Sequence, residues 1–242
     1  MAARQALTAL GAGAALLLAL VGCTATPAAD GGTSSSPPSG EVVEAEVDAT
    51  WLDDGRMIGI ITYGSSTCVP VVEDAGLQDN GTFAVILAEP DTEAVCTRDM
   101  VPRVTLVSAL PGMLPTEDLE ITVAGDGYSG DTELDAAPGL DPSNTASEFA
   151  PSAGWIDVDD SFVILTWGSS TCLPVVESTA ATAAAEVTVT FVDPPADQIC
   201  TMDMAPRALI TTVTGLSEDE GVTAILVGAE FGGARVPIYG SN

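Results

Sequence analysis

The sequence predicts an all-β protein made of two tandem modules, each a small β-sandwich or barrel-like unit with one disulfide. Residues 51–103 recur as residues 155–207 without a gap, so the two copies share a fold. Inside each copy, short runs rich in β-branched residues have a hydrophobic period of two and are separated by turn residues. About five to seven such strands per module are typical of a small sandwich or barrel.

Three segments carry the repeat most clearly. Trp-Leu-Asp at 51–53 returns as Trp-Ile-Asp at 155–157, and Gly-Ser-Ser-Thr-Cys at 64–68 returns unchanged at 168–172. Cys-Thr-Arg-Asp-Met-Val-Pro-Arg at 96–103 returns as Cys-Thr-Met-Asp-Met-Ala-Pro-Arg at 200–207. Both cysteines of each copy therefore occupy equivalent positions of the repeat.

The chain divides into parts with different compositions. We expect a signal peptide over residues 1–22, a flexible Ser/Pro/Gly-rich tether over 23–45, a β module over 46–136, a proline-containing linker over 137–152 and a second β module over 153–242. Residues 41–48 alternate between acidic and apolar and fit either a first edge strand or the end of the tether. The sequence leaves open whether the modules pack together.

The expected strands follow the alternating runs. In the first module they are residues 56–63, 82–88, 103–108 and 119–123, and in the second 161–167, 186–192, 208–213 and 222–227. Asp79-Asn80-Gly81 indicates a tight turn before the second of these strands. The matching segment of the second module, residues 178–185, contains mostly Ala and Thr, and we expect a small-residue loop there.

The N-terminal segment has the form of an export signal. Arg4 precedes an apolar run from Ala6 to Leu20 that is too short to span a membrane. Leu20-Val21-Gly22-Cys23, which ends this run, resembles the lipobox of bacterial lipoproteins. The resemblance implies that Cys23 is acylated, for example with palmitate, and anchors the chain on the extracytoplasmic face of the cell membrane. The alternative is an ordinary secretory signal in which Cys23 is incidental.

Four cysteines remain once Cys23 is set aside, and an even number in an exported chain indicates disulfides. The repeat favours Cys68 with Cys96 and Cys172 with Cys200, because each module then closes its own loop, which stabilises the fold by roughly 3–4 kcal/mol. A four-thiolate metal site is the alternative. Zinc sites of that kind usually contain a Cys-x-x-Cys pair, which this chain lacks, and the sequence contains no histidine.

The charge excludes partners that need a basic surface. The net charge is −29, and removal of residues 1–22 leaves five arginines and no lysine against 35 acidic residues. Nucleic acids and anionic lipid surfaces are bound through clustered Lys or Arg, so we expect neither as an electrostatic partner. Solubility is sufficient to explain the acidity, with cation binding as the alternative.

The repeated polar loops are the candidate binding residues: Ser65, Ser66, Thr67, Ser169, Ser170 and Thr171. Their hydroxyls and amides could hold a small anion. The structural interpretation is a turn in which Gly64 takes a positive φ angle and the hydroxyls bond to the local backbone.

Arg103 and Arg207 are the second candidate pair. Each is four residues after an aspartate of its own module, Asp99 or Asp203. We expect a fixed carboxylate partner inside the module, either that aspartate or the repeated Asp53 position. Recognition of a carboxylate on a ligand is the functional alternative.

Other chemistry has little support in the sequence. Met100 and Met204 are expected in the core, and neither copper binding nor any other metal site or cofactor is predicted. Residues 126–135 form an oxygen-rich stretch, but their spacing departs from an EF-hand loop. Without histidine or lysine, an activated serine or cysteine nucleophile lacks its base, so we do not expect an enzyme.

The pattern of a strand, Gly-Ser-Ser-x-Cys-x-Pro, about two dozen residues, and Cys-Thr-x-Asp-x-x-Pro-Arg is similar to one in uncharacterised exported lipoproteins of high-GC Gram-positive, actinobacterial type. It covers most of both modules and implies location and architecture, but no activity.

The sequence therefore predicts a lipid-anchored cell-envelope protein whose two modules bind an envelope protein or a small-molecule ligand without catalysis, because module duplication favours avidity. The alternatives are an acidic cation-binding or structural envelope protein and a carboxylate-dependent cell-wall hydrolase.

Overall fold

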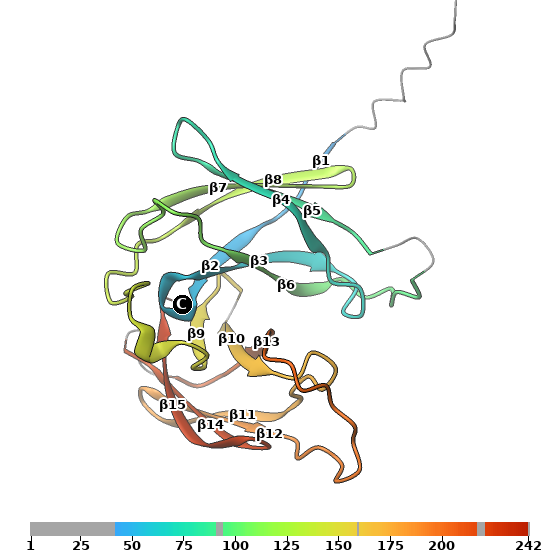
Figure 1. Ribbon diagram of the computed structural model, residues 1–242, viewed down its shortest axis with the longest axis vertical. Helices are drawn as coiled ribbons and strands as arrows, with labels where there is room; N and C mark the ends of the chain where they lie inside the picture. The colour runs from blue at the N-terminus through green and yellow to red at the C-terminus, as the bar shows by residue number, and fades with distance from the viewer. Residues whose placement is uncertain (1–41, 91–93, 159, 217–220, 242) are drawn as a thin grey trace, which may run out of the picture. The chain divides into compact units, whose positions relative to one another are not determined.

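The computed structural model describes residues 42–90, 94–158, 160–216 and 221–241. These residues form fifteen β-strands and two short 3-10 turns, with no α-helix among them (Figure 1). The all-β prediction with one disulfide in each of two modules is confirmed. The signal peptide, Cys23 and the tether up to residue 41 lie outside the described residues.

The first module contains two sheets. The five-stranded sheet has the order β1 (Val43–Glu44), β8 (Tyr128–Leu134), β7 (Leu119–Gly125), β5 (Phe83–Ala88) and β4 (Val71–Leu77). The three-stranded sheet has the order β2 (Asp48–Leu52), β3 (Met57–Gly64) and β6 (Val101–Ser108). Buried and exposed residues alternate along β7, as expected for a strand with one face on the core.

The second module repeats these strands, except β1, in one sheet. Its order is β11 (Val176–Ala183), β12 (Glu186–Phe191), β14 (Thr223–Gly228), β15 (Phe231–Tyr239), β9 (Ser152–Trp155), β10 (Ser161–Gly168) and β13 (Ala205–Thr212). The long β15 pairs in parallel with β9 through Ile238 and Ala153. This pairing joins two groups of strands whose counterparts form separate sheets in the first module.

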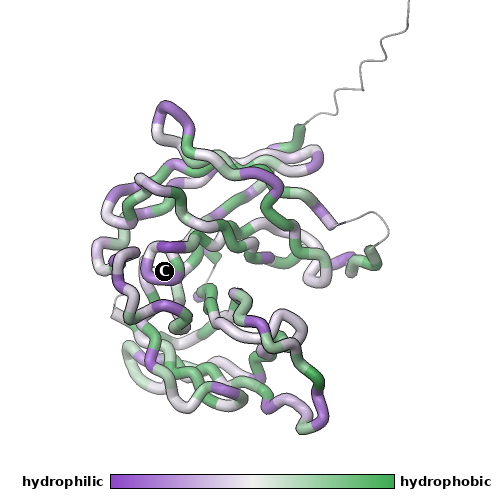
Figure 2. Tube along the Cα trace, in the orientation of Figure 1, coloured by the Kyte–Doolittle hydropathy of each residue, from purple (hydrophilic) through white to green (hydrophobic). Residues whose placement is uncertain are grey.

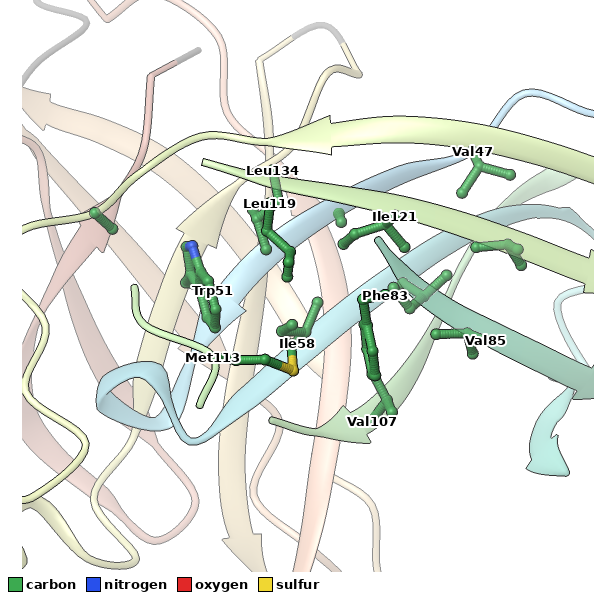
Figure 3. Packing of buried hydrophobic residues seen from close by; sticks show 14 of the residues in the cluster. Val47, Trp51, Ile58, Phe83, Val85, Val107, Met113, Leu119, Ile121 and Leu134 are labelled. Atoms are coloured by element: carbon green, nitrogen blue, oxygen red, sulfur yellow. The ribbon is translucent and has the colours of Figure 1, made fainter. Parts of the chain in front are cut away.

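Each module has its own apolar core. In the first, side chains from both sheets meet, among them Trp51, Ile58, Phe83 and Ile121 (Figure 3). In the second, Phe162, Val189 and other buried residues form the equivalent cluster. Green, hydrophobic segments run along the paired strands of both modules, and purple segments recur at many of the turns (Figure 2).

The two modules also share a core. Leu52 and Ile61 of the first module and Ile156, Val163 and Leu165 of the second form a third buried cluster. Because this cluster covers their outer faces, β3 and β10 are buried on both sides and lack the usual alternation. The modules are therefore packed on each other, which answers a question the sequence left open.

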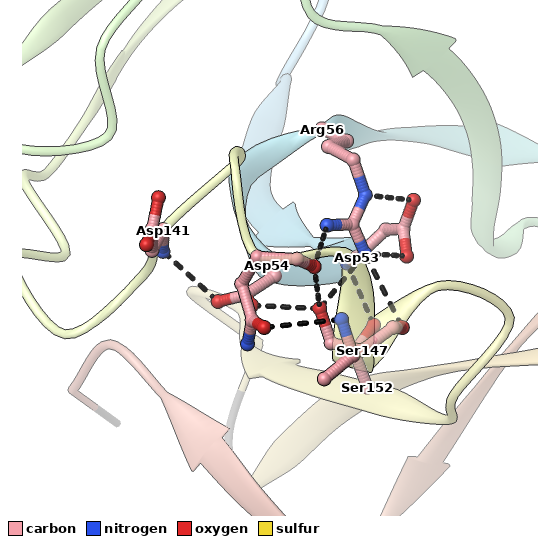
Figure 4. Close-up of polar contacts among 8 residues, drawn as sticks. Asp53, Asp54, Arg56, Asp141, Ser147 and Ser152 are labelled. Atoms are coloured by element: carbon pink, nitrogen blue, oxygen red, sulfur yellow. Dashed lines mark hydrogen bonds and ion pairs between the residues drawn. The ribbon is translucent and has the colours of Figure 1, made fainter.

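A polar network fixes the connection between the modules (Figure 4). Asp53 and Asp54 lie in the turn η1 (Asp53–Gly55), and the Asp53 amide donates to Ser152 Oγ at 2.8 Å. Asp54 Oδ2 accepts hydrogen bonds from Ser147 Oγ at 2.8 Å and from Asn144 Nδ2 at 3.0 Å. Ser147 belongs to the short turn η2 (Thr145–Ser147). The segment predicted as a linker is thus tied to the first module by side-chain hydrogen bonds.

The eight predicted strands are all present, with ends that differ by at most three residues. The Asn80-Gly81 turn is also present, with a φ angle of 89° at Gly81. Residues 43–44, inside the predicted tether, form the edge strand β1 and pair in parallel with β8.

One segment was predicted wrongly, and another was not predicted as a strand. Residues 178–185 were expected to form a small-residue loop but lie mainly in β11. β11 is an edge strand that pairs only with β12, and its Ala and Thr side chains are compatible with that position. The oxygen-rich stretch 126–135 is mostly β8, and its alternate side chains point to opposite faces instead of converging on a cation. Among the described residues, no group of three or more acidic or cysteine side chains is placed to hold a metal ion.

Candidate functional site

Each disulfide closes a polar loop at the end of a buried strand. β3 ends at Gly64 and β10 at Gly168, and the Gly-Ser-Ser-Thr-Cys segments follow directly. Cys68 is bonded to Cys96, and Cys172 to Cys200. The predicted pairing is therefore confirmed, and the loop after β3 or β10 is linked to the segment that leads into β6 or β13.

The hydroxyls of these loops bond mainly to one another. Ser65 Oγ lies 2.7 Å from Thr97 Oγ1 and 3.2 Å from Thr67 Oγ1. In the second module, the corresponding distances from Ser169 Oγ are 2.8 Å to Thr201 Oγ1 and 3.2 Å to Thr171 Oγ1. The close agreement shows that the repeat preserves this cluster in detail.

The aspartates of the loops complete the clusters. Asp99 accepts a hydrogen bond from the Ser66 amide at 3.2 Å, and Asp203 accepts one from the Ser170 amide at 3.1 Å. Hydrogen bonding to the serine hydroxyl, then to the neighbouring threonine, lowers the pKa of each aspartate to about 2. These internal bonds support the structural interpretation of the loops, and anion binding by them stays a prediction.

The arginine partners differ from those predicted. Arg103 is buried, and its Nη2 pairs with Glu89 Oε1 at 3.1 Å while its Nη1 donates to the carbonyl oxygen of Cys68 at 2.6 Å. Asp99 is not the partner because it faces the Ser66 amide. Asp53 is not the partner because it pairs with Arg56 at 2.7 Å. The expectation of a carboxylate within the module is confirmed, but its identity was predicted wrongly.

Arg207 has the same position and a different carboxylate. Its Nη1 donates to the carbonyl oxygen of Cys172 at 3.0 Å, and its Nη2 pairs with Glu230. The repeat places Asp193, not Glu230, at the position of Glu89. Asp193 instead accepts the amide of Ala229 at 2.8 Å. The arginine and the disulfide carbonyl are thus constant, while the acidic partner comes from different places in the fold.

Each arginine lies at the wall of a pocket. In the first module the pocket has a volume of about 630 Å³ and includes Tyr63, Glu89, Arg103 and Tyr128. Burial, followed by the negative charge of Glu89, raises the pKa of Tyr128. Burial, followed by the charges of Glu46 and Asp48, raises the pKa of Tyr63.

The pocket of the second module has nearly the same volume, about 650 Å³. Trp167 stands where the first module has Tyr63, and Phe231, the first residue of β15, directly follows Glu230. Phe149 closes one side and meets Trp167 edge to face, with ring centroids 5.1 Å apart. Both volumes fall in the range of small-molecule sites.

Exposed apolar side chains surround the disulfides at equivalent positions. Four repeat-related pairs are exposed in both modules: Val69 and Leu173, Val71 and Val175, Val95 and Ile199, Met100 and Met204. Val95 and Ile199 are 94% and 92% exposed. The expectation that Met100 and Met204 are core residues is therefore wrong. Met100 and Met204 lie directly before β6 and β13 and are exposed, so their apolar character does not serve the core.

Sequence reasoning missed several pocket residues. Glu230, Phe231 and Tyr128 lie beyond the aligned segments 51–103 and 155–207, so the repeat gave no reason to select them. Tyr63 and Trp167 offered a usable signal, because an aromatic residue precedes the Gly-Ser-Ser-Thr-Cys motif in both copies.

Comparison with known proteins adds no relative. No family model matches the chain, and neither a curated protein nor a solved structure matches it. In the part of the chain that the structure describes, no helix is long and apolar enough to cross a membrane.

Proposed function

We propose that this chain is a lipid-anchored, extracytoplasmic binding protein without catalytic activity, and that each module offers one ligand pocket beside its disulfide. The observation that carries the proposal is the duplication of the pocket. Both copies keep an aromatic residue, a buried arginine and nearly the same volume, together with exposed apolar residues at matching positions.

The exposed residues favour binding over a purely structural role. A solvent-exposed apolar side chain adds nothing to the core, and a patch of them marks an interaction site when its members are contiguous. Met100 lines the pocket of the first module, and Leu173 and Val175 line that of the second. The apolar surface thus continues from the pocket wall onto the disulfide loops.

Location outside the cytoplasm has separate support. The resemblance of the N-terminal segment to a lipoprotein signal supports an anchor at Cys23, and the two disulfides agree with an oxidising compartment. We also propose membership of the uncharacterised actinobacterial lipoproteins that the repeated motifs resemble. Two sites on one packed body allow two weak contacts with a partner to act together.

Binding of the neutral apolar dye Nile red tests the proposal. We expect the purified chain from Cys23 onward to bind two dye molecules with increased fluorescence. Met100→Asp and Leu173→Asp place a charge on the wall of the first or second pocket, and each is expected to remove one site. Leu114→Asp is the matched control because Leu114 is exposed but lies in neither pocket. Dye binding that all three substitutions leave unchanged would contradict the proposal.

A further inference from the structure

The charges that the pockets present to a ligand are negative, although each contains an arginine. The side chains of Arg103 and Arg207 are only 6% and 3% exposed, whereas those of Glu89 and Glu230 are 33% and 52% exposed. The guanidinium groups are directed to the carbonyl oxygens of Cys68 and Cys172. A ligand therefore meets the carboxylates, while the positive charges are held behind them.

The acidic groups also outnumber the arginines in each pocket. Glu46, Glu89 and Asp126 line the first pocket with Arg103. Asp193 and Glu230 line the second with Arg207. The carboxylate of Glu230 bonds Arg207 through Oε1 alone, which leaves its exposed side available for a hydrogen-bond donor. Both pockets thus offer acceptors and a net negative charge.

Aromatic rings line the same pockets. Tyr63 and Tyr128 belong to the first, and Phe149, Trp167 and Phe231 to the second. The faces of such rings attract cations, and a carboxylate next to them adds a direct ionic contact. Aromatic rings with adjacent carboxylates favour a cation attached to an apolar body over a strongly hydrated inorganic ion.

We propose that the two pockets bind organic cations, in which an ammonium or guanidinium group meets Glu89 or Glu230 and an apolar body packs on the aromatic rings. This inference rests on the proposed function. The first pocket, with three carboxylates and two tyrosines, favours the charge of the ligand. The second, with Trp167, Phe149 and prolines 174, 194 and 195, favours its apolar body.

The alternative is that Arg103 and Arg207 bind a carboxylate group of the ligand. The donors left for it include the Nε atoms of Arg103 and Arg207, which have no hydrogen-bond partner in the described structure. Both Nε atoms are closed off from solvent, so an anion reaches them only if the strands move. An anionic probe tests this reading directly.

Three probes of similar shape separate the possibilities: 3-phenylpropylamine, 3-phenylpropanol and 3-phenylpropanoate. Isothermal titration calorimetry on the chain from Cys23 onward is expected to show the amine binding at least about tenfold more tightly than the alcohol, with no binding of the carboxylate. Added salt should weaken the binding of the amine and leave the binding of the alcohol unchanged.

A charge substitution locates the contact. Glu230→Gln keeps an acceptor for Arg207 but removes the charge, and it should abolish the preference for the amine at the second pocket. Glu120→Gln removes the same charge from an exposed position of β7 outside both pockets and should change nothing. Thermal unfolding of each variant shows whether a loss of binding reflects a loss of folded protein.

The outcomes distinguish this inference from the proposed function. Equal affinity for amine and alcohol, or tighter binding of the carboxylate, overturns the inference and leaves two neutral or anion-binding pockets. Binding of Nile red without binding of the amine also overturns it. If neither Nile red nor any of the three probes binds, the proposed function itself is wrong.

Discussion

The guanidinium carbon of Arg103 lies 2.5 Å from the point that a β-carbon on Gly64 would occupy. Arg207 has the same relation to Gly168, at 2.7 Å. Both distances are too short for carbon atoms in contact, so only glycine lets the end of β3 or β10 pass over the arginine. Gly64 lacks the positive φ angle that we predicted, and the close approach of the arginine is the reason for the glycine.

Gly64→Ala is therefore expected to destabilise the fold by about 2–4 kcal/mol. The new methyl group would push the Arg103 guanidinium away from the Cys68 carbonyl and from Glu89, and leave a buried charge with fewer partners. Urea unfolding measures the change in the free energy of unfolding. Gly76→Ala is the control, because a β-carbon there meets nothing within 4 Å. Equal effects of the two substitutions would show that the contact is not tight.

The alternation of apolar and polar residues, together with the turn residues, was enough to predict the strands that have one face on the core. These signals were insufficient for β11, because its alanines are depleted in strands and give no clear apolar/polar alternation that separates it from a loop. The oxygen-rich residues 126–135, most of which form β8, were likewise not predicted as a strand. Only pairing with β7 across the sheet shows them to be the two faces of a strand.

The packing of the modules was present in the sequence as a pattern that we did not use. Ile58-Gly59-Ile60-Ile61 and Phe162-Val163-Ile164-Leu165 are continuous apolar runs at matching positions, which is typical of strands buried on both faces. The candidate site was harder to predict from the sequence. The disulfides and the arginines follow from the repeat, but their carboxylate partners depend on which loops the fold brings over the strand ends.

The shared core predicts that the modules stabilise each other. Leu165→Ala removes a side chain that is fully buried between the modules, and we expect a loss of about 2–5 kcal/mol in the free energy of unfolding. Leu173→Ala is the matched control, because Leu173 is 65% exposed and should change stability by less than about 0.5 kcal/mol. Chemical denaturation monitored by tryptophan fluorescence gives both values. A small effect of Leu165→Ala would mean that the modules contribute little to each other.

The predicted lipid anchor makes Cys23 the acylated residue. Expression of the full chain in a bacterium that processes lipoproteins, with an alkyne analogue of palmitate in the medium, should label the wild type and not the Cys23→Ser variant. A Cys68→Ser/Cys96→Ser double variant is the control, because those two cysteines form a disulfide and are not expected to carry lipid. Label that persists in Cys23→Ser would mean that the lipobox resemblance is misleading.

The low pKa values of Asp99 and Asp203 lead us to expect a loss of stability in acid. Hydrogen bonds from Ser66 and Ser170, then from Thr97 and Thr201, lower the folded-state pKa of each aspartate to about 2, from 3.8. A carboxyl group whose pKa is lower in the folded state stabilises the fold at a pH above its unfolded pKa. That contribution disappears as the pH falls toward the folded pKa. The two clusters should therefore lose their contribution between about pH 4 and pH 2.

Carbon-detected NMR of the carboxyl groups should give midpoints near 2 for Asp99 and Asp203. In urea unfolding, the difference between the wild type and an Asp99→Asn/Asp203→Asn variant should be constant above pH 4 and shrink as the pH falls. Asp48 provides a comparison of opposite sign: burial raises its pKa, so its ionisation opposes folding as the pH rises through 3.8. Midpoints at or above 3.8 for Asp99 and Asp203 would show that the hydroxyl clusters do not hold their carboxylates in solution.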